Sequence, residues 1–157
     1  MRVRILCCKG AGDGCIFAHF VANLVYFMKY EKIIEDRYVV LKPLEENMLG
    51  GMAPALKSEL TSLNVMGHRN IIVNFSEVKY IDSSIINALL TGRRLCDNLN
   101  GLLVIASPSP SVSRLIDISH LYEGFPIFPT QEEAKEAIYM HEIEREILTE
   151  NGEAKAE

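Results

Sequence analysis

An aspartate followed by two serines is the point in this chain where residue types and spacing could support chemistry. Asp82, Ser83 and Ser84 follow an apolar run of strand length, residues 71–75, and precede an apolar run spaced like a helix. The first turn of a helix has unpaired backbone N–H groups and a dipole that favours negative charge, so a hydroxyl there can accept a phosphate. The same residue types are also ordinary helix caps. Simple capping and a phosphorylation site are both open interpretations at this point.

The sequence does not support independent catalysis at these serines. A serine nucleophile needs a base, and the chain has no Gly-x-Ser-x-Gly elbow. Its histidines, none of which has an evident triad context, are His19, His68, His120 and His141. There is also no Gly-x-x-x-x-Gly-Lys-Ser/Thr phosphate loop, and the cysteines are not spaced as zinc ligands. We therefore expect a protein that acts by binding and has no enzymatic activity, metal or cofactor.

Composition limits the class of protein further. The 157 residues correspond to one domain, and the formal net charge of −5 argues against a nucleic-acid partner. No apolar stretch reaches the roughly 20 residues of a membrane-spanning helix. Three of the four cysteines lie within residues 7–15, which makes a poor disulfide framework. These features are typical of a cytoplasmic protein with free thiols.

The central part of the chain alternates between strands and helices, which must position the serines. Strand-like runs occur at residues 32–35, 38–42, 71–75, 102–106 and near 126–128. Helix-like spacing follows residue 52, Ser83, Pro110 and Thr130, and Gly67 is placed to end the first of these helices. The alternation predicts an α/β fold with a mixed, mostly parallel sheet and helices packed on it. We expect a single domain at residues 29–141 and a charged tail at residues 142–157.

Residues 1–28 lie outside this alternation. Residues 2–8 could form a strand, residues 10–14 form a glycine-rich loop, and residues 16–28 are apolar. This outline is that of a dinucleotide-binding turn, but the third glycine of that fingerprint would fall at Cys15. A signal peptide would need a small-residue cleavage site after the apolar run, and Met28 as the native start is a third interpretation. We interpret residues 1–28 as an appendage to the domain.

Two stretches carry a resemblance to a known family. Residues 71–84 include Ile-Ile-Val-Asn-Phe and end in Asp82-Ser83-Ser84, and residues 109–117 read Ser-Pro-Ser-Val-Ser-Arg-Leu-Ile-Asp. Together they resemble the two characteristic stretches of the STAS domain, the fold of bacterial anti-sigma factor antagonists. The order and spacing of elements from about Tyr30 to Ile138 also fit this family.

The resemblance implies a switch that works by phosphorylation. The family phosphorylation site is the first serine after the aspartate, which corresponds to Ser83. By this resemblance, an anti-sigma factor that is also a serine kinase modifies the site, and a serine phosphatase restores it. The unmodified protein would bind the anti-sigma factor, free a sigma factor and so regulate transcription. The implied partner-binding residues are Asp82, Ser83, Ser84, Ile85 and Asn87.

Ile85 departs from the family pattern, which usually has glycine after the two serines. Its side chain could fill the space where a kinase loop approaches, or it could mark a relative with another partner. One alternative is therefore a STAS scaffold, or an accessory subunit of a signalling or transport complex, that never cycles phosphate. Another is a small α/β nucleotide-binding protein that uses the N-terminal glycine loop.

Overall fold

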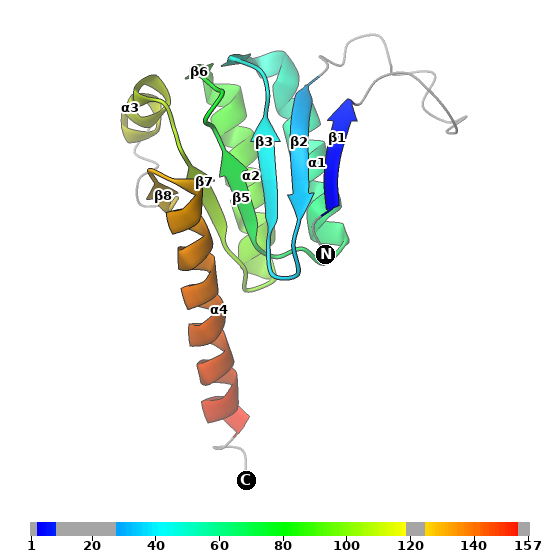
Figure 1. Cartoon of the computed structure of the whole chain (residues 1–157), viewed down its shortest axis with the longest axis vertical. Coiled ribbons are helices and arrows are strands. Elements are labelled where there is room, and N and C mark those ends of the chain that lie inside the picture. Colours follow the sequence, from blue (N-terminus) through cyan, green and yellow to red (C-terminus); the bar gives the residue numbers. More distant parts are fainter. Residues whose placement is uncertain (1–2, 9–27, 119–124, 154–157) are drawn as a thin grey trace, which may run out of the picture.

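A six-stranded sheet forms the centre of the fold (Figure 1). The computed structural model describes residues 3–8, 28–118 and 125–153. The strand order is β1-β2-β3-β5-β7-β8. The pairs β1–β2 and β2–β3 are antiparallel, whereas β3–β5, β5–β7 and β7–β8 are parallel. The predicted fold class, a mixed and mostly parallel sheet with helices packed on it, is confirmed.

The main strands and helices follow one another in the predicted order, and two short strands and a short 3-10 helix are additional. The strands are β1 (Val3–Cys8), β2 (Lys29–Ile34), β3 (Val39–Pro43), β4 (Asn47–Met48), β5 (Ile71–Asn74), β6 (Tyr80–Ile81), β7 (Leu103–Ala106) and β8 (Ile127–Phe128). The helices are the short 3-10 helix η1 (Gly50–Met52), α1 (Ala53–Val65), α2 (Ser83–Asn98), α3 (Pro110–Ile118) and α4 (Gln131–Glu153).

Helices cover both faces of the sheet. α1 and α2 lie on one face, where their apolar side chains join a core with alternate residues of β3, β5 and β7. α4 lies on the other face, where Ala134 and Ile138 pack with Val40, Ile72 and Val104. Every residue of β5 and β7 is buried because both faces of these strands are covered.

A glycine ends α1, as the sequence predicts. Gly67 has a φ of 88°, a left-handed conformation that a residue without Cβ adopts most readily. The Gly67 N–H donates to the Asn64 carbonyl at 2.9 Å, and the His68 N–H donates to the Leu63 carbonyl at 3.0 Å. These are the two hydrogen bonds of a Schellman cap, which satisfy carbonyls that the last helical turn leaves unpaired.

The sheet begins earlier in the chain than the sequence indicates. β1 pairs along its whole length with β2, from Val3 opposite Ile34 to Cys8 opposite Lys29. Residues 3–8 therefore belong to the sheet, which corrects the interpretation of residues 1–28 as an appendage in this part. The predicted glycine-rich loop and most of the apolar stretch lie outside the described residues.

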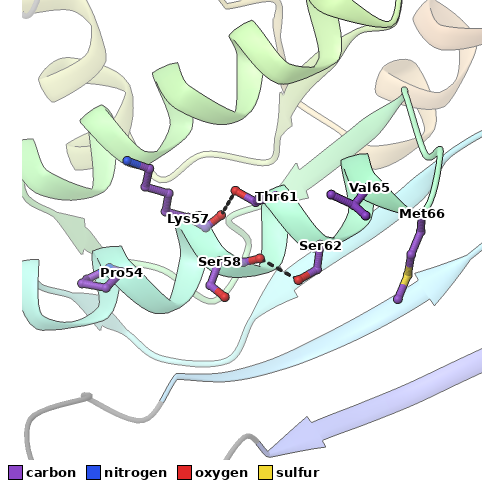
Figure 2. A pocket seen from close by; sticks show the side chains of 7 residues that line it. All are labelled: Pro54, Lys57, Ser58, Thr61, Ser62, Val65 and Met66. Carbon is purple, nitrogen blue, oxygen red and sulfur yellow. Dashed lines mark hydrogen bonds between the residues drawn. The ribbon is translucent and has the colours of Figure 1, made fainter. Parts of the chain in front are cut away.

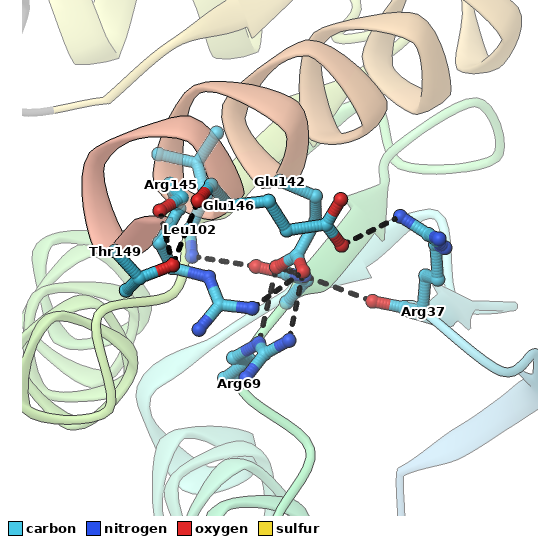
Figure 3. Close-up of polar contacts among 8 residues, drawn as sticks. Arg37, Arg69, Leu102, Glu142, Arg145, Glu146 and Thr149 are labelled. Carbon is cyan, nitrogen blue, oxygen red and sulfur yellow. Dashed lines mark hydrogen bonds and ion pairs between the residues drawn. The ribbon is translucent and has the colours of Figure 1, made fainter. Parts of the chain in front are cut away.

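The expected charged tail is largely a continuation of α4. The helix runs to Glu153, and Glu142, the first residue of that expected tail, is buried. The Glu142 carboxylate accepts two hydrogen bonds from the Arg69 guanidinium, at 3.0 and 2.7 Å, and one from Arg145 at 3.1 Å (Figure 3). This contact between distant parts of the sequence holds α4 against the sheet beyond residue 141. The expected end of the domain at residue 141 is therefore corrected.

Asn70 connects this ion cluster to two neighbouring chain segments. Its Nδ2 donates to Glu142 at 2.7 Å and to the Arg37 carbonyl at 2.9 Å, and its Oδ1 accepts from the Leu102 N–H at 3.0 Å. Burial raises the pKa of the Glu142 carboxyl, but the hydrogen bonds from Arg69 and Asn70 and nearby positive charges lower it to about 2. The carboxylate is therefore a charged anchor between α4 and the sheet.

Candidate functional site

The predicted site residues lie at the edge of the sheet where the parallel strands end. After β3 and β5 the chain forms a second, two-stranded sheet in which Asn47 lies opposite Tyr80 and Met48 opposite Ile81. The Glu46 carbonyl also accepts from the backbone N–H groups of Lys79 and Tyr80, at 2.7 and 3.1 Å. This pairing holds the loop after β3 against the segment that leads into α2.

Asp82 is the N-cap of α2. Its Oδ1 accepts from the backbone N–H of Ser84 at 3.0 Å and from that of Ile85 at 3.1 Å. Capping, one of the two interpretations that the sequence left open, is thus the role of Asp82. Ser83 is the first residue of the helix, and the side chains of Ser83, Ser84 and Asn87 are exposed. A hydroxyl at this position can accept a phosphate whose charge the helix dipole favours.

Ile85 differs from the other four predicted partner-binding residues. Its side chain is 0% exposed and belongs to the main hydrophobic core, together with Ile81 and Leu89. It therefore offers no exposed side chain to a partner, and its assignment as a contact residue is corrected. Position 85 is the third residue of α2, so its side chain points back into the domain while Ser83 and Ser84 face outward. Ile85 therefore fills volume in the core.

Gly50 lies close to the side chains of Asp82 and Ser84, a contact that sequence reasoning missed. A Cβ atom added to Gly50 would lie 3.1 Å from Asp82 Oδ2 and 3.1 Å from Ser84 Oγ, tighter than most such contacts. The Gly50-Gly51 pair was visible in the sequence as a loop signal, but its packing against the α2 cap depends on the tertiary fold. The loop after β3 is therefore part of the site.

Two exposed apolar side chains flank the serines and were also missed. Leu49 is 47% exposed and Tyr80 is 45% exposed, on the two segments that the short sheet joins. The sequence gives no clear signal for them, because Tyr80 and the buried Ile81 are both hydrophobic and only the structure shows which one faces outward. Large apolar or aromatic side chains next to polar groups are typical anchors of protein interfaces.

A second loop reaches the same edge of the sheet. Ser109 Oγ accepts from the Val112 N–H at 3.3 Å, so it caps α3, and Pro110 is the first residue of that helix. Serine at the cap and proline at the first helical position are residue types that favour the start of a helix. The Ser109 hydroxyl also donates to the Lys79 carbonyl at 3.2 Å. This contact connects the family-like stretch at residues 109–117 to the segment before Asp82.

Two described side chains that could take part in chemistry, His68 and Cys96, have shifted pKa values. His68 follows α1 at its C-terminal end, and its pKa is lowered by burial and by the charge of Lys32. The Cys96 thiol is buried, and burial together with Asp97 raises its pKa to about 12, which makes it unreactive. No group of three metal-ligating side chains occurs among the described residues. His19 and His120 lie outside them.

The helices of the described part of the chain include none with the length and hydrophobicity needed to cross a bilayer.

A pocket of about 580 Å³ lies along the outer face of α1 (Figure 2). Two of the three hydroxyls that line it already donate within the helix, Thr61 Oγ1 to the Lys57 carbonyl at 2.8 Å and Ser62 Oγ to the Ser58 carbonyl at 2.9 Å. Lys57 is the one charged residue among its described lining residues. The pocket therefore offers little for specific ligand recognition.

Comparisons with known proteins identify the fold. The family model of the STAS domain matches residues 30–134. A candidate anti-sigma factor antagonist from Thermotoga maritima superposes with a TM-score of 0.66 at 23% identity, over 70% of this chain and 94% of the other. The unphosphorylated form of the anti-sigma factor antagonist SpoIIAA gives 0.55 at 19% identity, over 70% and 97%. The phosphorylated form of the Bacillus cell fate determinant SpoIIAA gives 0.56 at 21% identity, over 71% and 98%. The chain belongs to the STAS domain family.

Proposed function

We propose that this protein is a cytoplasmic, phosphorylation-controlled switch of the anti-sigma factor antagonist type. In its unmodified form it binds an anti-sigma factor that is also a serine kinase, and this binding frees a sigma factor. Phosphorylation of Ser83 by that partner ends the interaction, and a serine phosphatase restores it. The exposed Ser83 hydroxyl at the N-terminus of α2 is the observation that carries the proposal.

The geometry around Ser83 supports modification without loss of the fold. Asp82 already caps α2 through its own carboxylate, so the helix does not depend on the Ser83 hydroxyl. A phosphate adds about −1.5 to −2 charges at neutral pH, which the N-terminal end of the sixteen-residue helix favours. The added charge therefore changes the surface that a partner meets more than it changes the domain.

The surface next to Ser83 supports binding of a protein partner. Leu49 and Tyr80 offer apolar contact area, and Ser84 and Asn87 offer exposed polar groups within one helical turn. A partner that covers these residues must remove water from any phosphate on Ser83. We propose Asp82, Ser83, Ser84 and Asn87 as the polar part of this contact, with Asp82 mainly holding the helix end in place.

Mapping of the modified residue tests this function. Protein isolated from its own cells is expected to carry phosphate on Ser83, and Ser83→Ala is expected to abolish that phosphorylation. Ser84→Ala is the matched control, since Ser84 is also exposed in the first turn of α2 but should leave the modification intact. Phosphate on Ser84 alone, or on neither serine under any growth condition, would instead favour a scaffold that does not cycle phosphate.

A further inference from the structure

The outer face of α4 carries a stripe of exposed apolar side chains. Met140, Ile143 and Ile147 are 58%, 47% and 50% exposed. With 100° between successive residues, they lie within an arc of about 60°. The buried residues Ala134 and Ile138 lie on the opposite side of the helix, against the sheet. In Figure 1 the C-terminal half of α4 also extends past the ends of the strands.

The charged residues that flank this stripe are negative. Glu136 falls within the same arc, Glu144 lies at its edge, and both are exposed. The helix has two basic residues besides His141, and both already form ion pairs within α4. Lys135 contacts Glu132 at 2.7 Å, and Arg145 contacts the buried carboxylate of Glu142 at 3.1 Å. The exposed stripe is therefore bordered by acidic groups that form no ion pair within the described part of the chain, and a partner molecule can supply their positive counterparts.

We propose that this face of α4 docks an amphipathic helix of another protein, with lysines or arginines beside its apolar residues. The stripe and its flanking acids extend from Glu136 to Ile147, about three helical turns or 17 Å. A partner helix of similar length can place apolar residues between the exposed side chains and basic residues against the two glutamates. A second copy of α4 does not fit, because it would bring Glu136 and Glu144 against further acids.

This surface is separate from the Ser83 switch. Ser83 lies on α2, which covers the face of the sheet opposite to α4. The stripe therefore provides a second contact, through which the protein can belong to a complex whether or not Ser83 is modified. This inference does not depend on the proposed function.

Two synthetic helical peptides of about 18 residues test the docking. They share one leucine seam and differ only in their flanking residues, which are lysine in one and glutamate in the other. Fluorescence anisotropy with the full chain should show binding of the lysine peptide that weakens with added salt, and at least about tenfold weaker binding of the glutamate peptide. Equal affinity for the two peptides, or binding of neither, would overturn the proposal.

Variants of the chain distinguish peptide binding at the stripe from unspecific hydrophobic binding. The double change Ile143→Ser and Ile147→Ser should weaken binding of the lysine peptide by about tenfold or more. Val65→Ser with Met66→Ser is the matched control, since those apolar residues are exposed at the end of α1, and it should change nothing. An equal loss in the control pair would contradict a site on α4.

Charge reversal supplies a test that does not remove apolar groups. Glu136→Lys with Glu144→Lys should make the chain prefer the glutamate peptide. An unaltered preference in the reversed variant would refute the charge argument. Sedimentation that shows a dimer, dissociated by the Ile143 and Ile147 changes, would assign the stripe to a second copy and overturn the proposed partner.

Discussion

Replacement of Ile85 with glycine restores the residue that the family usually has and tests whether position 85 packs or docks. The side chain is 0% exposed and lies in the main core with Ile81 and Leu89. Removing a buried isoleucine down to Cβ costs about 2–5 kcal/mol, and glycine within a helix adds about 1 kcal/mol relative to alanine. We therefore expect the variant to lose about 4 kcal/mol of unfolding free energy, a large part of the stability of a typical domain.

Urea denaturation followed by circular dichroism measures this loss. Asn87→Gly is the matched control, because Asn87 is exposed two residues further along the same helix and should lose about 0.5 kcal/mol. If Ile85→Gly does not fold, Ile85→Val still tests the reasoning, with an expected loss of about 1 kcal/mol. An Ile85→Gly variant that is no less stable than Asn87→Gly, but binds its partner poorly, would refute the packing role and return Ile85 to the docking surface.

Three further predictions concern the frame that holds the site. Because the Glu142 carboxyl has its pKa lowered from 4.5 to about 2, it contributes about 3 kcal/mol of stability above pH 5 that is lost as the pH falls towards 2. Denaturation at several pH values should show that Glu142→Gln removes this dependence, whereas exposed Glu146→Gln keeps it. Gly101→Ala should sharply lower the melting temperature, because its Cβ would lie 2.2 Å from the Arg69 carbonyl oxygen, and an unchanged value would contradict that contact. A chain that begins at Met28 should still unfold cooperatively, since β2 keeps β3 as a partner, and a molten chain would show that the preceding residues belong to the core.

The elements with strong local signals were predictable. β5 and β7 are short apolar runs bounded by polar residues, and burial of every residue in them follows from the predicted parallel sheet. The cap at Asp82 and the end of α1 at Gly67 each depend on residues only a few positions apart. Local sequence therefore located Ser83 at the start of a helix, which is where the structure has it.

Other features depend on contacts that local sequence does not contain. The pairing of β1 with β2 joins strands separated by the long segment that made residues 1–28 look unrelated to the domain. Glu142 looked like part of a charged tail, but its partners Arg69 and Asn70 lie more than 70 positions earlier. The burial of Ile85 likewise depends on which side of α2 faces the core, and one residue of helical rotation separates it from exposed Ser84.

The affinity of the chain for the proposed anti-sigma factor kinase, measured with and without charge at position 83, tests the proposed switch most directly. Ser83→Ala and the neutral Ser83→Asn should bind the kinase, and each should lose at most about 1 kcal/mol of stability. Ser83→Asp should fold normally but bind roughly a hundredfold more weakly, which corresponds to a penalty of about 3 kcal/mol for covering the new charge. Equal binding by the aspartate and asparagine variants in isothermal titration calorimetry would contradict the switch and identify the domain as a scaffold.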